Sequence, residues 1–276
     1  MVTKARANKP SYPELAKSFQ DFIQSKTVEG VTINTIEGYE RKFRVISRHI
    51  DLGTANRNEI ELFLLQFKNP GNRHSYFRVI RAYYNWRKET TGIPNPMGSM
   101  KAPRLPKLIL PALNPEQVKQ LIDYAEGNRN KAIIALFTES GLRLSELVQI
   151  RPEHIDWDDQ TVRVMGKGQK EALAPFGKLS EEYLKAWLSE YTPTDTIWGI
   201  NKWGITAMLR RLEVESGITC NPHTFRRTFA CILRKAGMDT LTIKDLGRWE
   251  SLEMVQRYTR SVNFADNLKF YKTVMG

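Results

Sequence analysis

The sequence is poor in the residues that cross-link small domains or bind structural metals. Its 276 residues include two cysteines, Cys220 and Cys231, and four histidines. The cysteines do not form a closely spaced pair of the kind that binds zinc, and two are too few for a disulfide framework. We therefore expect no structural metal site and no disulfide.

Long apolar runs are also absent. No stretch of about 18 uncharged apolar residues occurs, although a membrane-spanning helix would need one. The opening residues, MVTKARANKPSYPEL, lack the apolar segment of a secretory signal peptide. These two absences predict a cytoplasmic protein with no membrane partner.

Acidic residues are scarce relative to basic ones, and most of the imbalance lies in the first part of the chain. The sequence has 42 Lys and Arg against 30 Asp and Glu, a net charge of +12. Residues 1–110 contain 19 basic and 9 acidic residues, whereas residues 111–276 contain 23 and 21. Because a Lys or Arg placed on a phosphate releases condensed counterions, this surplus favours a polyanionic partner. Excess surface lysine on an ordinary soluble domain is the simpler alternative.

Apolar residues return every three or four positions over the first part of the chain, as they do in amphipathic helices. The pattern predicts four helices, over residues 13–25, 33–50, 57–67 and 72–90. We interpret residues 10–92 as a small helical domain.

Basic side chains repeat at helical spacing on the second and fourth of these predicted helices. On the second helix they occupy a different face from Tyr39 and Phe43. A basic stripe suits a phosphate backbone, although a solvated helix face gives the same pattern. The candidate nucleic-acid-binding residues are Arg41, Arg44, Arg48, Arg78, Arg81 and Lys88.

Proline and glycine mark a boundary after this domain. Between Gly92 and Pro111 the sequence contains five prolines and two glycines, which prevent a continuous helix. We expect a linker over residues 93–110 and a second domain over residues 111–276. A helix should begin after Asn114, because Pro115 and Gln117 complete an N-terminal capping signal.

The second domain changes its periodicity along the chain. An apolar helix is predicted over residues 130–140 and ends at Gly141, and a short helix follows over residues 145–150. Residues 154–176 alternate like a small antiparallel sheet with a glycine-flanked turn. The predicted fold is therefore mainly α with a small antiparallel β-sheet. Further helices are expected over residues 180–191, 202–216, 224–236, 240–247 and 252–259.

Side chains suited to phosphate chemistry are spread through this second domain. Breaking a phosphodiester without a metal needs a nucleophile, an acid for the leaving oxygen and fixed cations around the phosphoryl oxygens. Each candidate alone is more often structural, so it is their common order that indicates function. The candidates are Arg143 at a helix corner, Lys167 between two glycines, His223 and Arg226 three residues apart, and Trp249 nine residues before Tyr258.

These segments, SGLRLSEL, GKG, HTFR and LGRW followed by a tyrosine, resemble the tyrosine recombinase (phage integrase) family. The resemblance covers residues 111–276, and the basic helical front is similar to that family's core-binding domain but carries no motif. It implies a two-domain protein: a helical core-binding domain and an α+β catalytic domain. It also implies a reaction without a cofactor, needing neither Mg²⁺ nor ATP.

The resemblance assigns a role to each matching residue. Arg143 and Arg226 would clamp the scissile phosphate, and Tyr258 would attack it to give a 3′-phosphotyrosyl intermediate. Lys167 would protonate the 5′-hydroxyl leaving group, as a general acid. The other implied roles are proton exchange for His223, donation from the indole N–H for Trp249, and orientation of the site for Glu146.

The chain departs from the family pattern in two places. Ala172 stands where relatives often have a basic residue. The glycine of the family's LGH element is displaced here, as Gly247 followed by Arg248. Neither departure removes one of the residues just named.

The resemblance also implies partners. They are double-stranded DNA with a specific core site and three further copies of the chain, as a homotetramer on two paired sites, in the cytoplasm at the nucleoid. DNA integration, excision or dimer resolution would be the outcome, and a role for accessory DNA-bending proteins stays open. The residues after Tyr258 are too apolar for a free tail, and they fold back on their own domain or dock on a neighbour.

Two other functions are compatible with the composition. A type IB topoisomerase uses the same tyrosine chemistry without pairing sites, and the helical front domain and the LGRW element favour a recombinase over it. A DNA-binding regulator that has lost the chemistry would explain the basic charge equally well. It would not explain why all six candidate catalytic residues are present.

Overall fold

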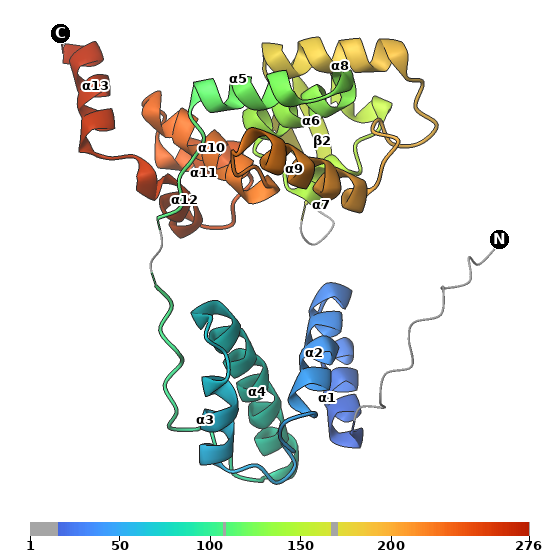
Figure 1. Ribbon diagram of the computed structural model, residues 1–276, viewed down its shortest axis with the longest axis vertical. Helices are drawn as coiled ribbons and strands as arrows, with labels where there is room; N and C mark the ends of the chain where they lie inside the picture. The colour runs from blue at the N-terminus through green and yellow to red at the C-terminus, as the bar shows by residue number, and fades with distance from the viewer. Residues whose placement is uncertain (1–15, 107–108, 167–170, 276) are drawn as a thin grey trace. The chain divides into compact units, whose positions relative to one another are not determined.

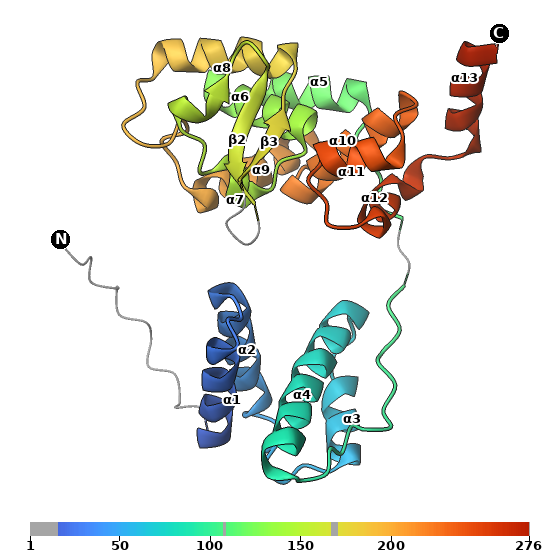
Figure 2. The ribbon, with the colours of Figure 1, turned by 180° about the vertical axis from the view of Figure 1, so that it is seen from behind.

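The computed structural model describes residues 16–106, 109–166 and 171–275, except for the side chain of Phe270. The chain divides into two compact units, residues 1–108 and 109–276, which are shown from two sides in Figures 1 and 2. Each unit is described by itself.

The described residues of the first unit form a bundle of four helices, at or within a few residues of the positions that the sequence predicts. An unexpected capping signal starts the longest helix two residues early, because Asn69 accepts a hydrogen bond from the backbone N–H of Asn72 and Pro70 occupies the first turn. The helices are α1 (Lys17–Val28), α2 (Ile33–Ile46), α3 (Arg57–Leu65) and α4 (Pro70–Thr91).

Aromatic side chains fill the centre of this bundle. Phe19 and Phe43 stack with their ring centroids 4.4 Å apart, and Phe22 meets Phe43 edge to face at 5.6 Å. Tyr83 from α4 packs against all three rings and is fully buried. Such rings bury a large apolar area, so this cluster holds α1, α2 and α4 together.

Part of the expected linker belongs to the first unit. Met97 and Met100 are buried in the core of the bundle, and His74 bonds to the carbonyl oxygen of Pro103. The proline-rich sequence correctly predicts that the described residues of this segment, 93–106 and 109–110, form neither helix nor strand. It does not show that two methionines anchor that segment to the bundle.

The second unit surrounds one buried helix. Helix α6 (Gly127–Ser140) is apolar on nearly all sides and packs against α5 (Pro115–Tyr124), α8 (Lys178–Glu190) and α10 (Pro222–Lys235). Its burial explains why its apolar residues are not confined to one face. The other helices described before the C-terminal segment are α7 (Leu144–Leu147), the short 3₁₀ helix Pro152–His154, α9 (Lys202–Ser216) and α11 (Thr240–Leu246).

A small antiparallel sheet lies in this second unit. Its order is β1 (Ile155–Asp156), β2 (Thr161–Met165) and β3 (Glu171–Pro175). Val162 pairs with Ala174, and both are fully buried, which sets the register against the core. The mainly helical fold with a small antiparallel sheet is confirmed.

The start of the second unit is attached to α10. The backbone N–H of Leu113 donates to Thr228 Oγ1 at 2.9 Å, and Arg227 Nε donates to the carbonyl oxygen of Pro111 at 2.7 Å. These bonds fix the helix that carries His223 and Arg226 relative to the first residues of the unit.

The chain ends with α12 (Leu252–Tyr258), the 3₁₀ helix Thr259–Ser261 and α13 (Phe264–Met275). Helix α13 projects from the unit in both views (Figures 1 and 2), although Asp266 near its start pairs with Lys235 of α10 at 3.0 Å. Its apolar residues Phe264, Tyr271 and Val274 are exposed. Among the residues that the structure describes, no helix is long and apolar enough to cross a membrane.

Candidate active site

The corner between α6 and α7 places Arg143. Gly141 ends α6 with a left-handed φ of +57°, and a Cβ at this position would lie 2.5 Å from the ring of Phe229. Glycine is therefore required both by the backbone and by the ring beside it. The chain then turns into α7 with Arg143 at its N-terminal boundary, as the sequence predicts.

Glu146 holds Arg143 at two points. Its carboxylate accepts a hydrogen bond from the backbone N–H of Arg143 at 2.9 Å and another from Arg143 Nη1 at 2.5 Å. The Glu146 side chain is 2% exposed, whereas that of Arg143 is 32% exposed. The buried Glu146 carboxylate thus fixes one side of the Arg143 guanidinium, and the other side stays exposed to solvent.

Arg226 is buried between two glycine carbonyls. Its Nη1 donates to the carbonyl oxygen of Gly141 and its Nη2 to that of Gly247 at 2.6 Å. Its guanidinium carbon also lies 4.5 Å from the ring centroid of Trp249. Burial, and then the charges of Arg143 and Arg248, lower the pKa of Arg226 to about 10, so it is still cationic at neutral pH.

Trp249 packs between Arg226 and Tyr258. Its ring centroid is 5.5 Å from that of Tyr258, and Val255 and Phe229 pack around it. Its indole Nε1 is buried and has no hydrogen-bond partner among the described residues. An orphaned buried donor costs free energy, and one inside a cationic site is suited to an anionic oxygen of a ligand.

Gly247 is required by the packing of the candidate site, a requirement that sequence reasoning missed. A Cβ on this residue would lie 1.8 Å from the Trp249 ring. The φ of Gly247 is −83°, which any residue can adopt, so the requirement comes only from the ring. No local sequence signal reveals this requirement, because it arises only from the way the Trp249 ring folds back over Gly247, two residues earlier in the chain.

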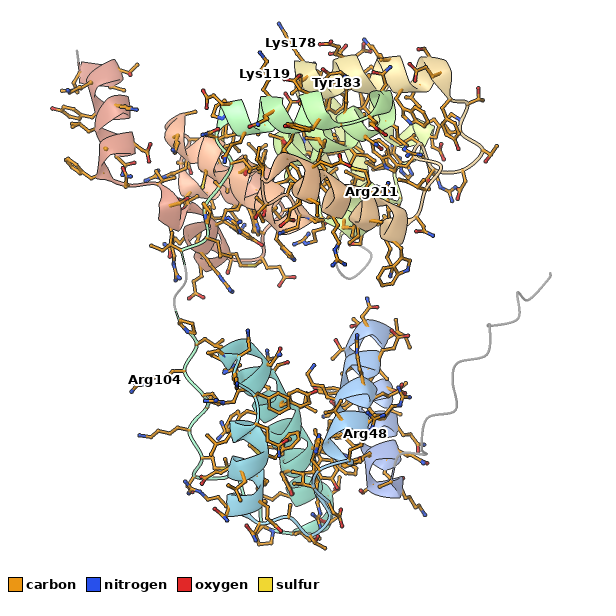
Figure 3. All side chains as sticks on the ribbon, in the orientation of Figure 1. Arg48, Arg104, Lys119, Lys178, Tyr183 and Arg211 are labelled. Carbon is orange, nitrogen blue, oxygen red and sulfur yellow. The ribbon has the colours of Figure 1, made fainter. Side chains whose placement is uncertain are left out.

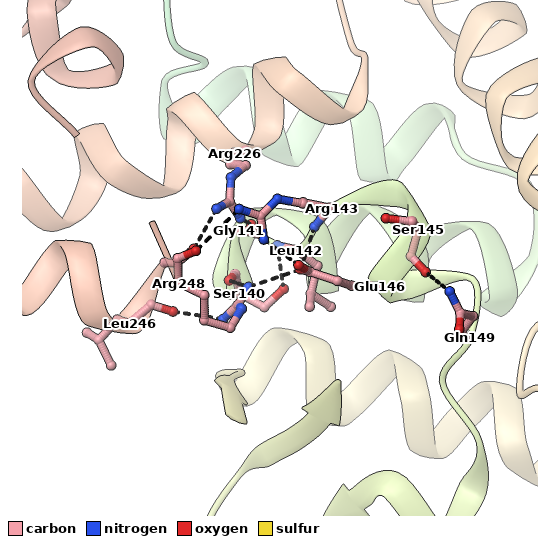
Figure 4. Close-up of polar contacts among 11 residues, drawn as sticks. Ser140, Gly141, Leu142, Arg143, Ser145, Glu146, Gln149, Arg226, Leu246 and Arg248 are labelled. Carbon is pink, nitrogen blue, oxygen red and sulfur yellow. Dashed lines mark hydrogen bonds and ion pairs between the residues drawn. The ribbon is translucent and has the colours of Figure 1, made fainter. Parts of the chain in front are cut away.

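Arg248 is the second residue that was missed. Its Nη2 donates to the carbonyl oxygen of Ser140 at 3.1 Å and pairs with Glu146 Oε2 at 3.6 Å. Figure 4 shows Arg143 and Arg248 beside Glu146, with Arg226 next to Arg143. The departure from the family pattern at this position was the available signal.

His223 lies at the start of α10, whose N-cap Asn221 accepts hydrogen bonds from the backbone N–H groups of His223 and Thr224. Partial loss of water, and then the charges of Arg226, Arg227 and Arg143, lower the pKa of His223 below its usual range. The imidazole is therefore neutral at pH 7 and can accept a proton.

Lys167 lies outside the described residues. The strands on either side of it are described, with Met165 of β2 paired to Glu171 of β3. The hairpin strands that the sequence predicts are therefore present, and the role of Lys167 stays a prediction.

The basic side chains of the first unit do not all share one surface. Partial burial, and then the charges of Arg41 and Arg78, lower the pKa of Lys42, which places cations of α2 and α4 close together. Arg81 instead donates to the carbonyl oxygens of Met97 and Met100. Arg44 lies 3.5 Å from Glu40, while Arg48, labelled in Figure 3, and Lys88 are exposed.

Comparison with known proteins identifies the family. The profile of the phage integrase family matches residues 111–263, which is more than half of the chain. The chain belongs to the phage integrase family. The residues matched include Arg143, Arg226, Trp249 and Tyr258, so the family assignment rests on the unit that contains the site.

Individual relatives agree with this assignment. The chain is 26% identical over 273 residues to the tyrosine recombinase XerD of Listeria innocua serovar 6a, covering 87% of this chain and 92% of the relative. A lambda integrase dimer bound to a COC′ core site has the same fold, with a TM-score of 0.74 at 15% identity over 90% of this chain and 96% of that one. A lambda integrase tetramer bound to a Holliday junction has a TM-score of 0.71 at 16% identity, covering 85% and 77%.

Replacing Gly247 with alanine should disturb the site through Trp249. The added methyl group overlaps the ring, so we expect Gly247→Ala to lower the free energy of unfolding by about 1–3 kcal/mol, a typical cost of overpacking. Chemical denaturation of the full chain measures this. Gly38→Ala is the matched control, because its Cβ would meet nothing within 4 Å on helix α2 and should be neutral or slightly stabilising.

His223 should make stability depend on pH. Because its pKa is lower in the folded chain, the unfolded chain binds the proton more readily, and stability is lost as the pH falls below about 7. The melting temperature of the wild type should therefore fall more steeply between about pH 7.5 and 5.5 than that of His223→Gln. Equal slopes for the two proteins would contradict the lowered pKa.

Proposed function

We propose that this protein is a site-specific DNA recombinase that cleaves and rejoins strands through a covalent bond between Tyr258 and a backbone phosphate. The carrying observation is the continuous contact from nucleophile to cations. The ring centroids of Tyr258 and Trp249 are 5.5 Å apart, and the guanidinium carbon of Arg226 lies 4.5 Å from the Trp249 centroid. Arg226 donates a hydrogen bond to the carbonyl oxygen of Gly247, and Arg143 donates one to the next carbonyl oxygen, that of Arg248.

The proposed reaction conserves bond energy. The Tyr258 hydroxyl oxygen attacks the phosphorus, a 3′-phosphotyrosyl bond forms, and the bond to the 5′ oxygen breaks. A 5′-hydroxyl of another strand then reverses the step and releases Tyr258. Because the phosphoester is exchanged rather than hydrolysed, the reaction needs no ATP.

Arg143 and Arg226 supply the positive charge that a metal supplies in other phosphoryl transfers. Among the described residues, Arg143 and Arg248 pair with the carboxylate of Glu146, while Arg226 bonds to backbone carbonyls, so three guanidinium groups share one carboxylate and the cluster carries excess positive charge before any ligand binds. A phosphate that gains charge in the transition state is stabilised by such preorganised donors. We therefore expect activity without Mg²⁺, with Trp249 Nε1 as a further donor.

The proton transfers are assigned to Lys167 and His223. The 5′ oxygen leaves as a hydroxyl only if an acid protonates it, and the Lys167 ammonium is our proposed acid. His223, with its lowered pKa, exchanges a proton with the nucleophile or the phosphate.

We propose double-stranded DNA with a specific core site as the substrate, and a homotetramer on two paired sites as the active assembly. The exposed apolar residues of α13 support contact with another copy, and the tetrameric lambda integrase relative supports the number. On this view the C-terminal tail docks on a neighbour. DNA integration, excision or dimer resolution follows in the cytoplasm, at the nucleoid.

Tyr258→Phe should abolish covalent capture of DNA. The test uses a double-stranded core-site substrate nicked beside the cleavage position, so that the short 5′-hydroxyl fragment is lost and the intermediate accumulates. In EDTA, wild type should give an adduct that survives denaturant and is seen by gel electrophoresis. An adduct with Tyr258→Phe, or none with wild type on its own site, would overturn the mechanism.

Two further assays and the nicked substrate together separate the alternatives. A recombinase exchanges strands only between paired core sites, whereas a topoisomerase relaxes a supercoiled plasmid that lacks them. A regulator binds DNA and forms no adduct.

Arg143→Lys should reduce cleavage and keep binding. A lysine preserves the charge but cannot donate to Glu146 and to a phosphate in fixed directions at once. We expect the rate of adduct formation to fall about 100- to 1,000-fold, as when one preorganised donor is removed. A gel-shift assay should show core-site affinity close to wild type, and a variant that cleaves normally would contradict this role.

A further inference from the structure

Arg248 occupies the interior of the site although the family pattern assigns it no role. Its side chain is 8% exposed, and its guanidinium reaches the carbonyl oxygens of Leu246 at 2.7 Å and Ser140 at 3.1 Å. Ser140 is the last residue of α6, so this arginine connects the turn after α11 to the corner that carries Arg143.

The guanidinium also shares the anion that holds Arg143. Arg248 Nη2 lies 3.6 Å from Glu146 Oε2, while Arg143 Nη1 donates to Glu146 Oε1 at 2.5 Å. The carboxylate is therefore placed between the two arginines. Since Glu146 is buried, the orientation of its carboxylate depends on both arginines. Moving or removing the Arg248 guanidinium should therefore change the position of the Arg143 guanidinium.

The backbone of Arg248 makes a separate contact with the same partner. Its carbonyl oxygen accepts a hydrogen bond from Arg143 Nη2 at 3.3 Å (Figure 4). The φ of Arg248 is +55°, a backbone conformation that residues with a Cβ rarely adopt. Strained backbone of this kind persists where surrounding contacts enforce it, often at functional sites.

Stability alone does not account for an arginine here. Its Nε is buried without a hydrogen-bond partner among the described residues, and glycine would adopt the positive φ without strain. An arginine at this position therefore lowers the stability of the fold in two ways, through its unpaired buried Nε and through its strained backbone.

We propose that Arg248 is a positioning residue: through Glu146 and through its own carbonyl it sets the Arg143 guanidinium for the scissile phosphate. This inference rests on the proposed function. Arg248 itself does not touch the reacting atoms. It joins the segment that carries Trp249 and Tyr258 to the corner that carries Arg143, so that nucleophile and cation move together.

Arg248→Gly and Arg248→Lys test the proposal on the nicked core-site substrate. Glycine keeps the positive φ and removes the guanidinium, and we expect adduct formation at saturating protein to slow about 10- to 100-fold, as for a small displacement of a catalytic group. Lysine keeps a charge near Glu146 and should lose less than glycine. DNA affinity in a gel-shift assay should stay within about threefold of wild type for both.

Gln160→Gly is the matched control. Gln160 is the other described non-glycine residue with a positive φ, at +50°, and it lies in the turn between β1 and β2, where its side chain donates to Glu181 Oε2 at 2.7 Å and not to a residue of the candidate site. It should cleave at the wild-type rate. If Arg248→Gly unfolds, the lysine variant carries the test, and a lysine variant that cleaves at the wild-type rate would overturn the proposal.

A double-mutant cycle with Glu146→Gln distinguishes positioning from a general effect on folding. If the Arg248 guanidinium acts through Glu146, Arg248→Gly should slow a Glu146→Gln protein by less than threefold. Effects that multiply would overturn the proposal, as would a single Arg248→Gly variant within threefold of wild type. Either result leaves the proposed function standing, whereas the absence of any adduct with wild type would count against that function instead.

Discussion

The burial of the Arg226 guanidinium is the constraint on which the rest of the site depends. An uncompensated buried charge costs several kcal/mol, so the chain must supply partners on all sides. It does so with the carbonyl oxygens of Gly141 and Gly247 and with the face of Trp249. Both glycines are required by an aromatic ring, Phe229 in one case and Trp249 in the other.

A consequence of this arrangement is that the proposed nucleophile, Tyr258, and the cations belong to one packed unit. Trp249 contacts Arg226 on one side and Tyr258 on the other. Burial, and then the charges of Arg143 and Arg248, keep the pKa of Arg226 low, and a bound anion would relieve the repulsion between these cations. This arrangement therefore supports the proposal that the site binds a ligand whose negative charge grows during the reaction.

Much of the fold could be predicted from periodicity and capping signals. Asn114 caps α5 with Pro115 and Gln117 as expected, Gly141 ends α6, and the alternation at residues 161–165 forms a strand. These signals are local, since the cap, the turn and the alternating face each involve residues within one or two turns of each other. Segments held in place by contacts with residues far away in the sequence were less well predicted. An example is the segment over residues 95–103, which Met97 and Met100 attach to the bundle.

The sequence by itself determined the family, the mainly helical fold and the candidate residues Arg143, His223, Arg226, Trp249 and Tyr258, because these follow from motif order and helical spacing. Tertiary structure alone decided the contacts of Gly247 and Arg248 and the hydrogen bonds of Arg81 to the segment that follows α4. The physical reason is distance along the chain. Arg248 meets Ser140 and Arg143 more than one hundred residues away, and no local pattern encodes which carbonyl a guanidinium will find.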